Sequence, residues 1–186
     1  MKEKVIVTTD GKVYRLLKNR KEIEAKVKEL AIRIKQNYPN AINPPILLFV
    51  MTGGLYLGVD LSRVLAELQF KFNIDYVSLK RNYDQDGNVE ILNYPRTRLN
   101  GRDVIVVEDL IDEGLTMNFL HLLLTSSSFD LRSLQYCTLF MKKHHKELSF
   151  KVKYLGWEIG PNWLIGNGMD SDECYRGQLD VYQSES

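Results

Sequence analysis

The sequence predicts an α/β fold with a central parallel sheet of about five strands flanked by helices. Apolar runs of strand length alternate with amphipathic segments of helical period. The apolar runs show no alternation in polarity, which is typical of strands that helices cover on both faces. One run leads directly into carboxylates, a glycine and a threonine, and the carboxyl ends of such strands are where open α/β sheets bind ligands.

Length and composition favour a single domain. The balanced charge gives it no general electrostatic attraction to nucleic acid or to an anionic membrane. The 186 residues, 44% of them hydrophobic, can bury one sizeable core. We predict a single domain over residues 1–186, with a core at about 40–150 and a small hood formed by about 1–18 and 151–186. The formal net charge of +1 implies neither nucleic acid nor membrane as a partner. Since no signal peptide or transmembrane run is recognisable, we expect a cytoplasmic protein.

The first helix has both a start signal and a helical repeat. Asn19 and Glu22 have the spacing of a capping box. Apolar residues then recur at helical spacing over residues 23–34. We expect this helix to end at Tyr38-Pro39, because proline disfavours helical backbone in the residue before it.

A strand, a helix and a second strand follow. The run "ILLFVM", residues 46–51, predicts a buried strand, and Gly53-Gly54 opens a helical stretch through Leu68. Residues 74–79 predict the next strand. The polar segment that follows them carries turn signals and is long for a connection, as binding loops are, sometimes with a small hairpin inside.

The second half continues the alternation and then breaks it. Residues 104–107 predict another buried strand, 116–125 a helix and 134–141 a further strand. Residues 150–186 contain only short apolar runs between glycines, and we expect this tail to cover the sheet.

Four carboxylates lie where the strand at 104–107 ends. Glu108 and Asp109 follow it directly, and Asp112 and Glu113 precede a glycine and Thr116 at a helix start. Backbone N–H groups at such a start, with the positive end of the helix, favour a phosphate. The alternative is a solvated acidic turn in which Thr116 caps the helix. The complete order of strand, carboxylates, glycine, threonine and helix favours the ligand site.

At this point the sequence resembles the hypoxanthine-guanine phosphoribosyltransferase family, the 6-oxopurine branch of the type I phosphoribosyltransferases. The run "VIVVEDLIDEGLTM", residues 104–117, is similar to the family's motif for phosphoribosyl pyrophosphate (PRPP). The segments "FVMTGG", "LFMKK" and "WLIGNGMDSDECYRG" extend the resemblance in the family's order over residues 46–180.

The resemblance implies a purine salvage enzyme. It would transfer 5-phosphoribose from PRPP to N9 of hypoxanthine or guanine, giving IMP or GMP and pyrophosphate, with Mg²⁺ as cofactor. A homodimer or homotetramer is implied as well.

The resemblance also gives each matching residue a role. The general acid/base beside purine N7 is Asp112. The ribose and 5-phosphate side is formed by Glu108, Asp109, Asp112, Glu113, Gly114, Leu115 and Thr116. The pyrophosphate side is formed by Thr52, Gly53, Gly54 and Arg176. The purine side is formed by Lys142, Trp163, Leu164 and Asp170. The metal would be held by Glu108, Asp109 and Asp170, and Tyr83 is the nearest match to the family's lid residue.

Three positions depart from the family pattern. Thr52 stands where many members of the family carry lysine. The family's non-proline cis peptide at this point would here join Met51 to Thr52. Glu113 replaces a small hydroxyl residue in the phosphate loop, so we expect its side chain to point outward. Tyr83 is displaced by about one position from the lid motif.

Other interpretations stay open on sequence alone. The PRPP fold could serve a regulator that senses nucleotides or binds RNA, which pyrophosphate release would distinguish from an enzyme. A NAD-binding protein is disfavoured because no GxGxxG follows the first strand of the core. Lys143 competes with Lys142 as the purine ligand, and the choice among hypoxanthine, guanine and xanthine is not decided by the residue types.

Overall fold

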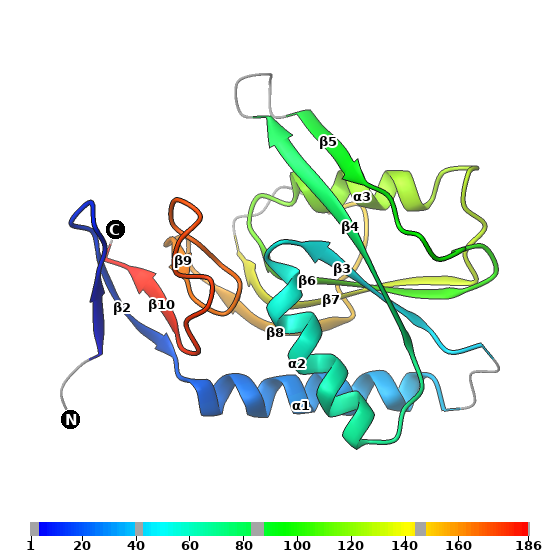
Figure 1. The fold of residues 1–186 in the computed structure, drawn as a ribbon, viewed down its shortest axis with the longest axis horizontal. Coiled ribbons are helices and arrows are strands. Elements are labelled where there is room, and N and C mark those ends of the chain that lie inside the picture. The colour runs from blue at the N-terminus through cyan, green and yellow to red at the C-terminus, as the bar shows by residue number, and fades with distance from the viewer. Residues whose placement is uncertain (1–3, 40–42, 83–87, 144–147, 186) are drawn as a thin grey trace.

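A computed structural model describes residues 4–39, 43–82, 88–143 and 148–185. Its centre is a six-stranded sheet in the order β5-β4-β3-β6-β7-β8 (Figure 1). The strands are β3 (Ile46–Met51), β4 (Asn73–Asn82), β5 (Asn88–Asn93), β6 (Asp103–Ile111), β7 (Ser133–Lys142) and β8 (Tyr154–Ile159). Strands β4, β3, β6, β7 and β8 run parallel, and β5 is an antiparallel edge. The predicted fold class is confirmed.

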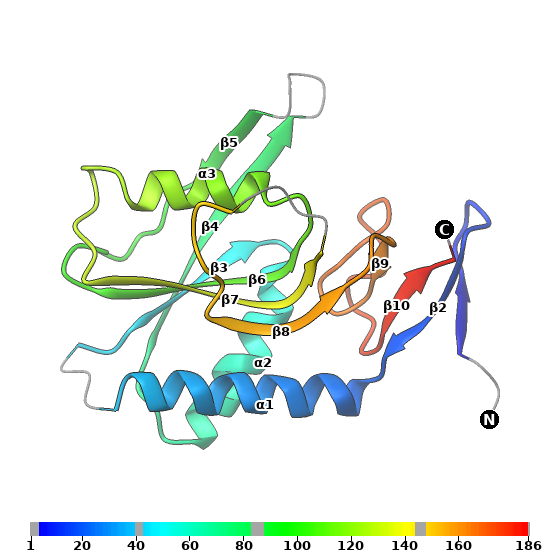
Figure 2. The same ribbon diagram turned by 180° about the vertical axis from the view of Figure 1, so that it is seen from behind.

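Helices cover both faces of this sheet. They are α1 (Arg20–Asn37), α2 (Gly54–Glu67) and α3 (Leu115–Leu124). Helices α1 and α2 lie on one face and α3 on the other (Figures 1 and 2). The predicted capping box of α1 is present, since Asn19 Oδ1 accepts from Glu22 N at 3.1 Å and Asn19 N donates to Glu22 Oε2 at 3.0 Å. In the described part of the chain, no helix combines the length and apolar character needed to cross a membrane.

The unbroken apolar run of β3 is explained by burial on two sides. Leu47 and Phe49 pack into the cluster that contains the apolar sides of α1 and α2. Leu48 and Val50 pack into the other cluster, with Met117 of α3. Successive side chains of a strand point to opposite faces, so a strand covered twice needs apolar residues at every position.

The two ends of the chain form a second, antiparallel sheet in the order β1-β2-β10-β9. Its strands are β1 (Val5–Val7), β2 (Val13–Lys18), β9 (Leu164–Ile165) and β10 (Val181–Ser184). A small apolar cluster of Tyr14, Ile165 and Tyr182 holds it together. This sheet is the hood that we expected from the terminal segments, and Figures 1 and 2 place it beside the core.

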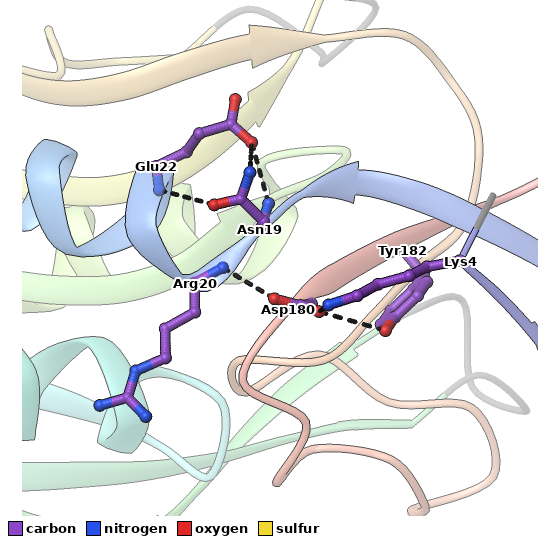
Figure 3. Close-up of polar contacts among 6 residues, drawn as sticks. All are labelled: Lys4, Asn19, Arg20, Glu22, Asp180 and Tyr182. Carbon is purple, nitrogen blue, oxygen red and sulfur yellow. Dashed lines mark hydrogen bonds and ion pairs between the residues drawn. The ribbon is translucent and has the colours of Figure 1, made fainter. Parts of the chain in front are cut away.

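One carboxylate joins the hood to the core. Asp180 accepts hydrogen bonds from Lys4 Nζ at 2.7 Å, from Arg20 N at 2.8 Å and from the Tyr182 hydroxyl at 3.3 Å (Figure 3). It thereby connects the N-terminal segment, the start of α1 and the start of β10.

Two segments differ from the sequence-based expectation. Strand β8 lies in the expected hood range of 151–186, but it pairs in parallel with β7 as the edge of the central sheet. The polar segment after residue 79 is partly strand, because β4 continues to Asn82 and pairs antiparallel with β5. An edge hairpin is largely solvated, so its sequence lacks the apolar run that identifies a buried strand.

Candidate active site

A cavity of about 500 Å³ lies at the carboxyl ends of the central strands. Nearly every site residue predicted from the sequence and described in the structure lines it. These residues are Thr52, Gly53, Glu108, Asp109, Asp112, Glu113, Gly114, Leu115, Thr116, Lys142, Trp163, Leu164, Asp170 and Arg176. The sheet topology therefore brings together segments that are far apart in the chain.

The acidic pair at the end of β6 is almost completely buried. Glu108 is 8% exposed and Asp109 is 6% exposed. Burial raises the pKa of Glu108 well above its ordinary value, and the adjacent Asp109 charge raises it further. Burial also raises the pKa of Asp109. Hydrogen bonds from Glu108 and from the amide of Leu110 lower this pKa, but burial has the larger effect. Two neighbouring carboxylates in a low-dielectric site disfavour joint ionisation unless a positive group binds them.

Two glycines allow the backbone to approach Asp109. A Cβ at Gly53 or at Gly168 would collide with the Asp109 carboxylate. Gly168 also has φ of +109°, a conformation that side chains rarely adopt. The carboxylate thus lies between the segment after β3 and the segment after β9.

The turn before α3 presents backbone amides to the cavity. Gly114 is the N-cap in a left-handed conformation with φ of 83°, and no side chain of the described residues caps the helix. The alternative of an acidic turn capped by Thr116 is therefore wrong. The first N–H groups of a helix have no partner within the helix, so this end, with its positive dipole, is suited to an anion.

The lysine that ends β7 and an aspartate directly after β6 meet inside the cavity. Lys142 Nζ donates to Asp112 Oδ2 at 2.8 Å, with the lysine side chain 5% exposed and the aspartate side chain 37% exposed. Residues at the ends of β6 and β7 meet because the two strands pair in parallel. Lys143, the competing lysine, is exposed and does not line the cavity.

The segment after β9 closes one side of the cavity through polar contacts. Trp163 Nε1 donates to the Asp170 carbonyl at 2.7 Å, and Lys142 Nζ lies 5.7 Å from the Trp163 ring centroid. Arg176 contacts Asp170 Oδ1 at 2.8 Å and donates to the Gly168 carbonyl at 2.6 Å. These contacts orient an aromatic face, a carboxylate and a guanidinium on the same wall.

Of the remaining predictions, one residue does not line the cavity, one is not described, and one lines the cavity without completing a metal site. Gly54 does not line the cavity but begins α2 against the Val107 carbonyl. Tyr83 lies outside the described residues. Asp170 does not complete a preformed metal site, because no group of three acidic, histidine or cysteine side chains suited to a metal occurs among the described residues.

The sequence reasoning missed Arg81. This residue of β4 lines the cavity and forms an ion pair with Glu113. The side chain of Glu113 is 46% exposed and is directed toward Arg81, rather than simply outward. No sequence signal pointed to this contact, because the two residues lie 32 positions apart and Arg81 falls in the long polar segment.

The expected cis peptide is present between Met51 and Thr52. It follows β3 and leads into Gly53, so Thr52 and Gly53 lie on the cavity wall. Thr52 supplies a hydroxyl at the position where lysine was expected from the resemblance.

The fold and this cavity define an α/β protein with a ligand site at the carboxyl ends of its parallel strands, and comparison with known proteins gives its family. The chain belongs to the phosphoribosyl transferase domain family, which matches residues 14–172.

Individual relatives show which members of the family the chain is similar to. The chain is 33% identical to a hypoxanthine-guanine phosphoribosyltransferase of Mycobacterium avium, over 93% of this chain and 90% of the relative. It is 33% identical to a hypoxanthine-guanine-xanthine phosphoribosyltransferase of Tritrichomonas foetus, over 87% of this chain and 86% of the relative. A solved structure of a mutant Trypanosoma cruzi hypoxanthine phosphoribosyltransferase with the product IMP has a TM-score of 0.83 and 27% identity. That alignment covers 91% of this chain and 90% of the solved chain.

Proposed function

We propose that this protein is a purine salvage enzyme that transfers 5-phosphoribose from PRPP to N9 of a 6-oxopurine, giving IMP or GMP and pyrophosphate. One observation carries the proposal. A buried acidic pair, an amide-lined helix start and a Lys-Asp pair face the same cavity in a chain of this family. The relatives named above support hypoxanthine and guanine as the bases, with xanthine a third candidate.

Each wall of the cavity has a chemical part in this reaction. The helix start at Gly114 would hold the 5-phosphate through backbone N–H groups. Lys142 would donate to the purine O6, and Asp112, which it contacts, would hold the proton at N7. The exposed face of Trp163 would stack on the base, and the Leu164 carbonyl would accept from its edge.

The leaving group requires positive charge. As pyrophosphate departs, the ribose ring becomes electron-poor while the leaving oxygen gains negative charge. Arg176 and the amides near Thr52 and Gly53 would bind pyrophosphate, and carboxylates beside the sugar would stabilise the positive ring. Closure of the site by the family's lid motif, with Tyr83 as its nearest match, remains a prediction.

The acidic pair suits the magnesium ion that the family implies. Mg²⁺ prefers oxygen ligands, and it is commonly held by one or two carboxylates together with substrate phosphates and water. Glu108 and Asp109 supply such oxygens, and their burial side by side disfavours joint ionisation more than the nearby Arg176 offsets it. When bound, the ion would offset the charge of PRPP. Asp170 would contribute to the metal site only once the substrate and Mg²⁺ are bound, since in the free protein its carboxylate contacts Arg176.

Two further parts of the proposal rest on the resemblance to the family. We propose a homodimer or homotetramer and a cytoplasmic location. Light scattering on the purified protein tests the first, and fluorescence of the tagged chain in its native cells tests the second.

Pyrophosphate release is the direct test of the function. We expect release when PRPP, Mg²⁺ and hypoxanthine or guanine are added together, and none when any one component is withheld. Folded protein that releases no pyrophosphate with hypoxanthine, guanine or xanthine would instead support a regulator. No observation favours the regulator at present, and competition among the three bases would establish the preference.

A further inference from the structure

Arg81 and Glu113 form an ion pair across the phosphate side of the cavity. Arg81 Nη2 lies 2.6 Å from Glu113 Oε2, and both residues line the cavity. Arg81 belongs to β4, where it pairs with Val89 of β5, whereas Glu113 belongs to the turn before α3. The pair therefore connects the β4–β5 hairpin to the start of α3, and Figure 1 shows these elements close together.

Glu113 is in a position that would disfavour phosphate binding without such a partner. It directly precedes Gly114, the N-cap of α3, where the helix presents N–H groups and positive charge. A carboxylate near a helix start is attracted to the same amides as a phosphate, and it repels that phosphate at short range. The guanidinium of Arg81 holds this carboxylate toward β4 and offsets its charge.

We propose that Arg81 is a positioning residue for 5-phosphate recognition, acting through Glu113. It keeps the Glu113 carboxylate away from the amides at the start of α3, so that these amides donate to the substrate phosphate. This inference deepens the proposed function and rests on it, because the phosphate in question is that of PRPP and of the nucleotide product.

A double-mutant cycle tests this coupling. We expect Arg81→Gln to raise the KM for PRPP on the order of tenfold with little change in kcat, as expected when a contact between coupled residues is lost. The inhibition constant of IMP should rise in parallel, because IMP carries the same 5-phosphate. Removing the Glu113 charge as well, in R81Q/E113Q, should return both constants close to those of Glu113→Gln alone.

Three controls separate positioning from other roles. Arg81→Lys retains the charge and should restore most of the PRPP affinity. Lys80→Gln removes a positive charge from an exposed position next to Arg81 in β4 and should leave the KM unchanged. Pyrophosphate inhibition should be the same in Arg81→Gln and wild type, because the effect is confined to the 5-phosphate side.

The inference has clear contrary outcomes. If Arg81→Gln raises the KM for PRPP as much in the E113Q background as in wild type, Arg81 binds substrate directly and the proposal is wrong. A change in pyrophosphate inhibition would also contradict it. Should Arg81→Gln fold poorly, the cycle can be completed with Arg81→Met, which also removes the charge, and Glu113→Gln.

A binding measurement keeps this test independent of the proposed reaction. Calorimetry with ribose 5-phosphate on wild type and the variants should show the same non-additive pattern in affinity. One outcome is that wild type releases no pyrophosphate while the effects of the Arg81 and Glu113 variants on ribose 5-phosphate affinity are non-additive. In that case the proposed function fails and the positioning role stands. If wild type is active and the cycle is additive, only the positioning role fails.

Discussion

At the scale of single residues, the site contains groups that the protein fold alone would disfavour. Glu108 and Asp109 are buried side by side, and burial raises the pKa of each. Their joint ionisation is unfavourable without a bound cation. We therefore expect these residues to reduce the stability of the free protein while they serve the bound state.

Glu108→Gln should stabilise the free protein at neutral pH and reduce its activity. A carboxyl group whose pKa is higher in the folded protein favours folding at a pH below its unfolded pKa. This contribution to the free energy of unfolding is lost as the pH rises through the folded pKa. At pH 7.5 without Mg²⁺, we expect Glu108→Gln to raise the free energy of unfolding by roughly 1–3 kcal/mol. Each kcal/mol corresponds to about 2–4 °C in Tm.

Thermal denaturation of Glu108→Gln at pH 7.5 and near pH 4 measures this effect. The difference from wild type should shrink at the lower pH, where the carboxyl is protonated in the folded state and largely protonated in the unfolded state. Glu158→Gln, at an exposed position of β8, should change Tm little. A Tm below wild type at pH 7.5 would show that the charge of Glu108 is already compensated.

Asp112→Asn should lower turnover while the fold persists. The amide retains an oxygen that can accept from Lys142 but cannot hold a proton for N7. We expect kcat to fall by roughly 10²- to 10⁴-fold, the usual contribution of a general acid/base. Steady-state kinetics with saturating PRPP measure it, with the exposed Asp130→Asn as control. Unchanged turnover would exclude Asp112 as the acid/base.

At the scale of elements, the spacing of apolar residues predicted the helices and strands that pack into the core. Helix α1 and strand β3 were evident because each must present apolar residues at a fixed spacing to the core. The turn signals allow a small hairpin in the polar segment, but the bounds of β5 and the end of β4 were not predicted, since a solvated edge hairpin has no such requirement. Strand β8 was assigned to the hood because a short apolar run does not show which sheet it joins.

Gly54→Ala should destabilise the contact between α2 and β6. The Cα of Gly54 faces the Val107 carbonyl, and an added Cβ would collide with that backbone. We expect a loss of about 1–3 kcal/mol, as for other insertions into close-packed regions. Urea denaturation measures it, with Gly160→Ala as control, because a Cβ at Gly160 would have its nearest contact at 3.5 Å. Equal stability of the two variants would contradict the packing argument.

At the scale of the whole molecule, the hood and the core depend on one another. The cavity has walls from the central sheet and from the segment after β9, so its geometry requires both parts to stay together. Asp180 links them through Lys4 and Arg20 N (Figure 3). None of these three residues lines the cavity, yet we expect the link to affect the site.

Asp180→Asn should weaken the junction in a pH-dependent way. Burial raises the pKa of Asp180, but hydrogen bonds from Lys4 and the Arg20 amide outweigh it, and the pKa is lowered overall. A lowered carboxyl pKa stabilises the fold above the unfolded value, and the contribution is lost as pH falls through the folded value. At pH 7 we expect Asp180→Asn to lose about 1–3 kcal/mol.

Denaturation of Asp180→Asn at pH 7 and near pH 3 measures this contribution. The loss should diminish at the lower pH, and Asp130→Asn should show little change at either. A loss that is the same at both pH values would mean that the charge of Asp180 has no part in the junction.

The sequence by itself determined the fold class and the order of most core elements, because a buried strand requires continuous apolar residues and the carboxyl ends of parallel strands are where polar residues can meet a ligand. Its resemblance to the family named most of the residues that line the cavity. Only the tertiary structure decided that β8 completes the central sheet, that Lys142 reaches Asp112 and that Arg81 reaches Glu113. Contacts of this kind depend on strand register and on the relative position of distant segments, which no local pattern of residues records.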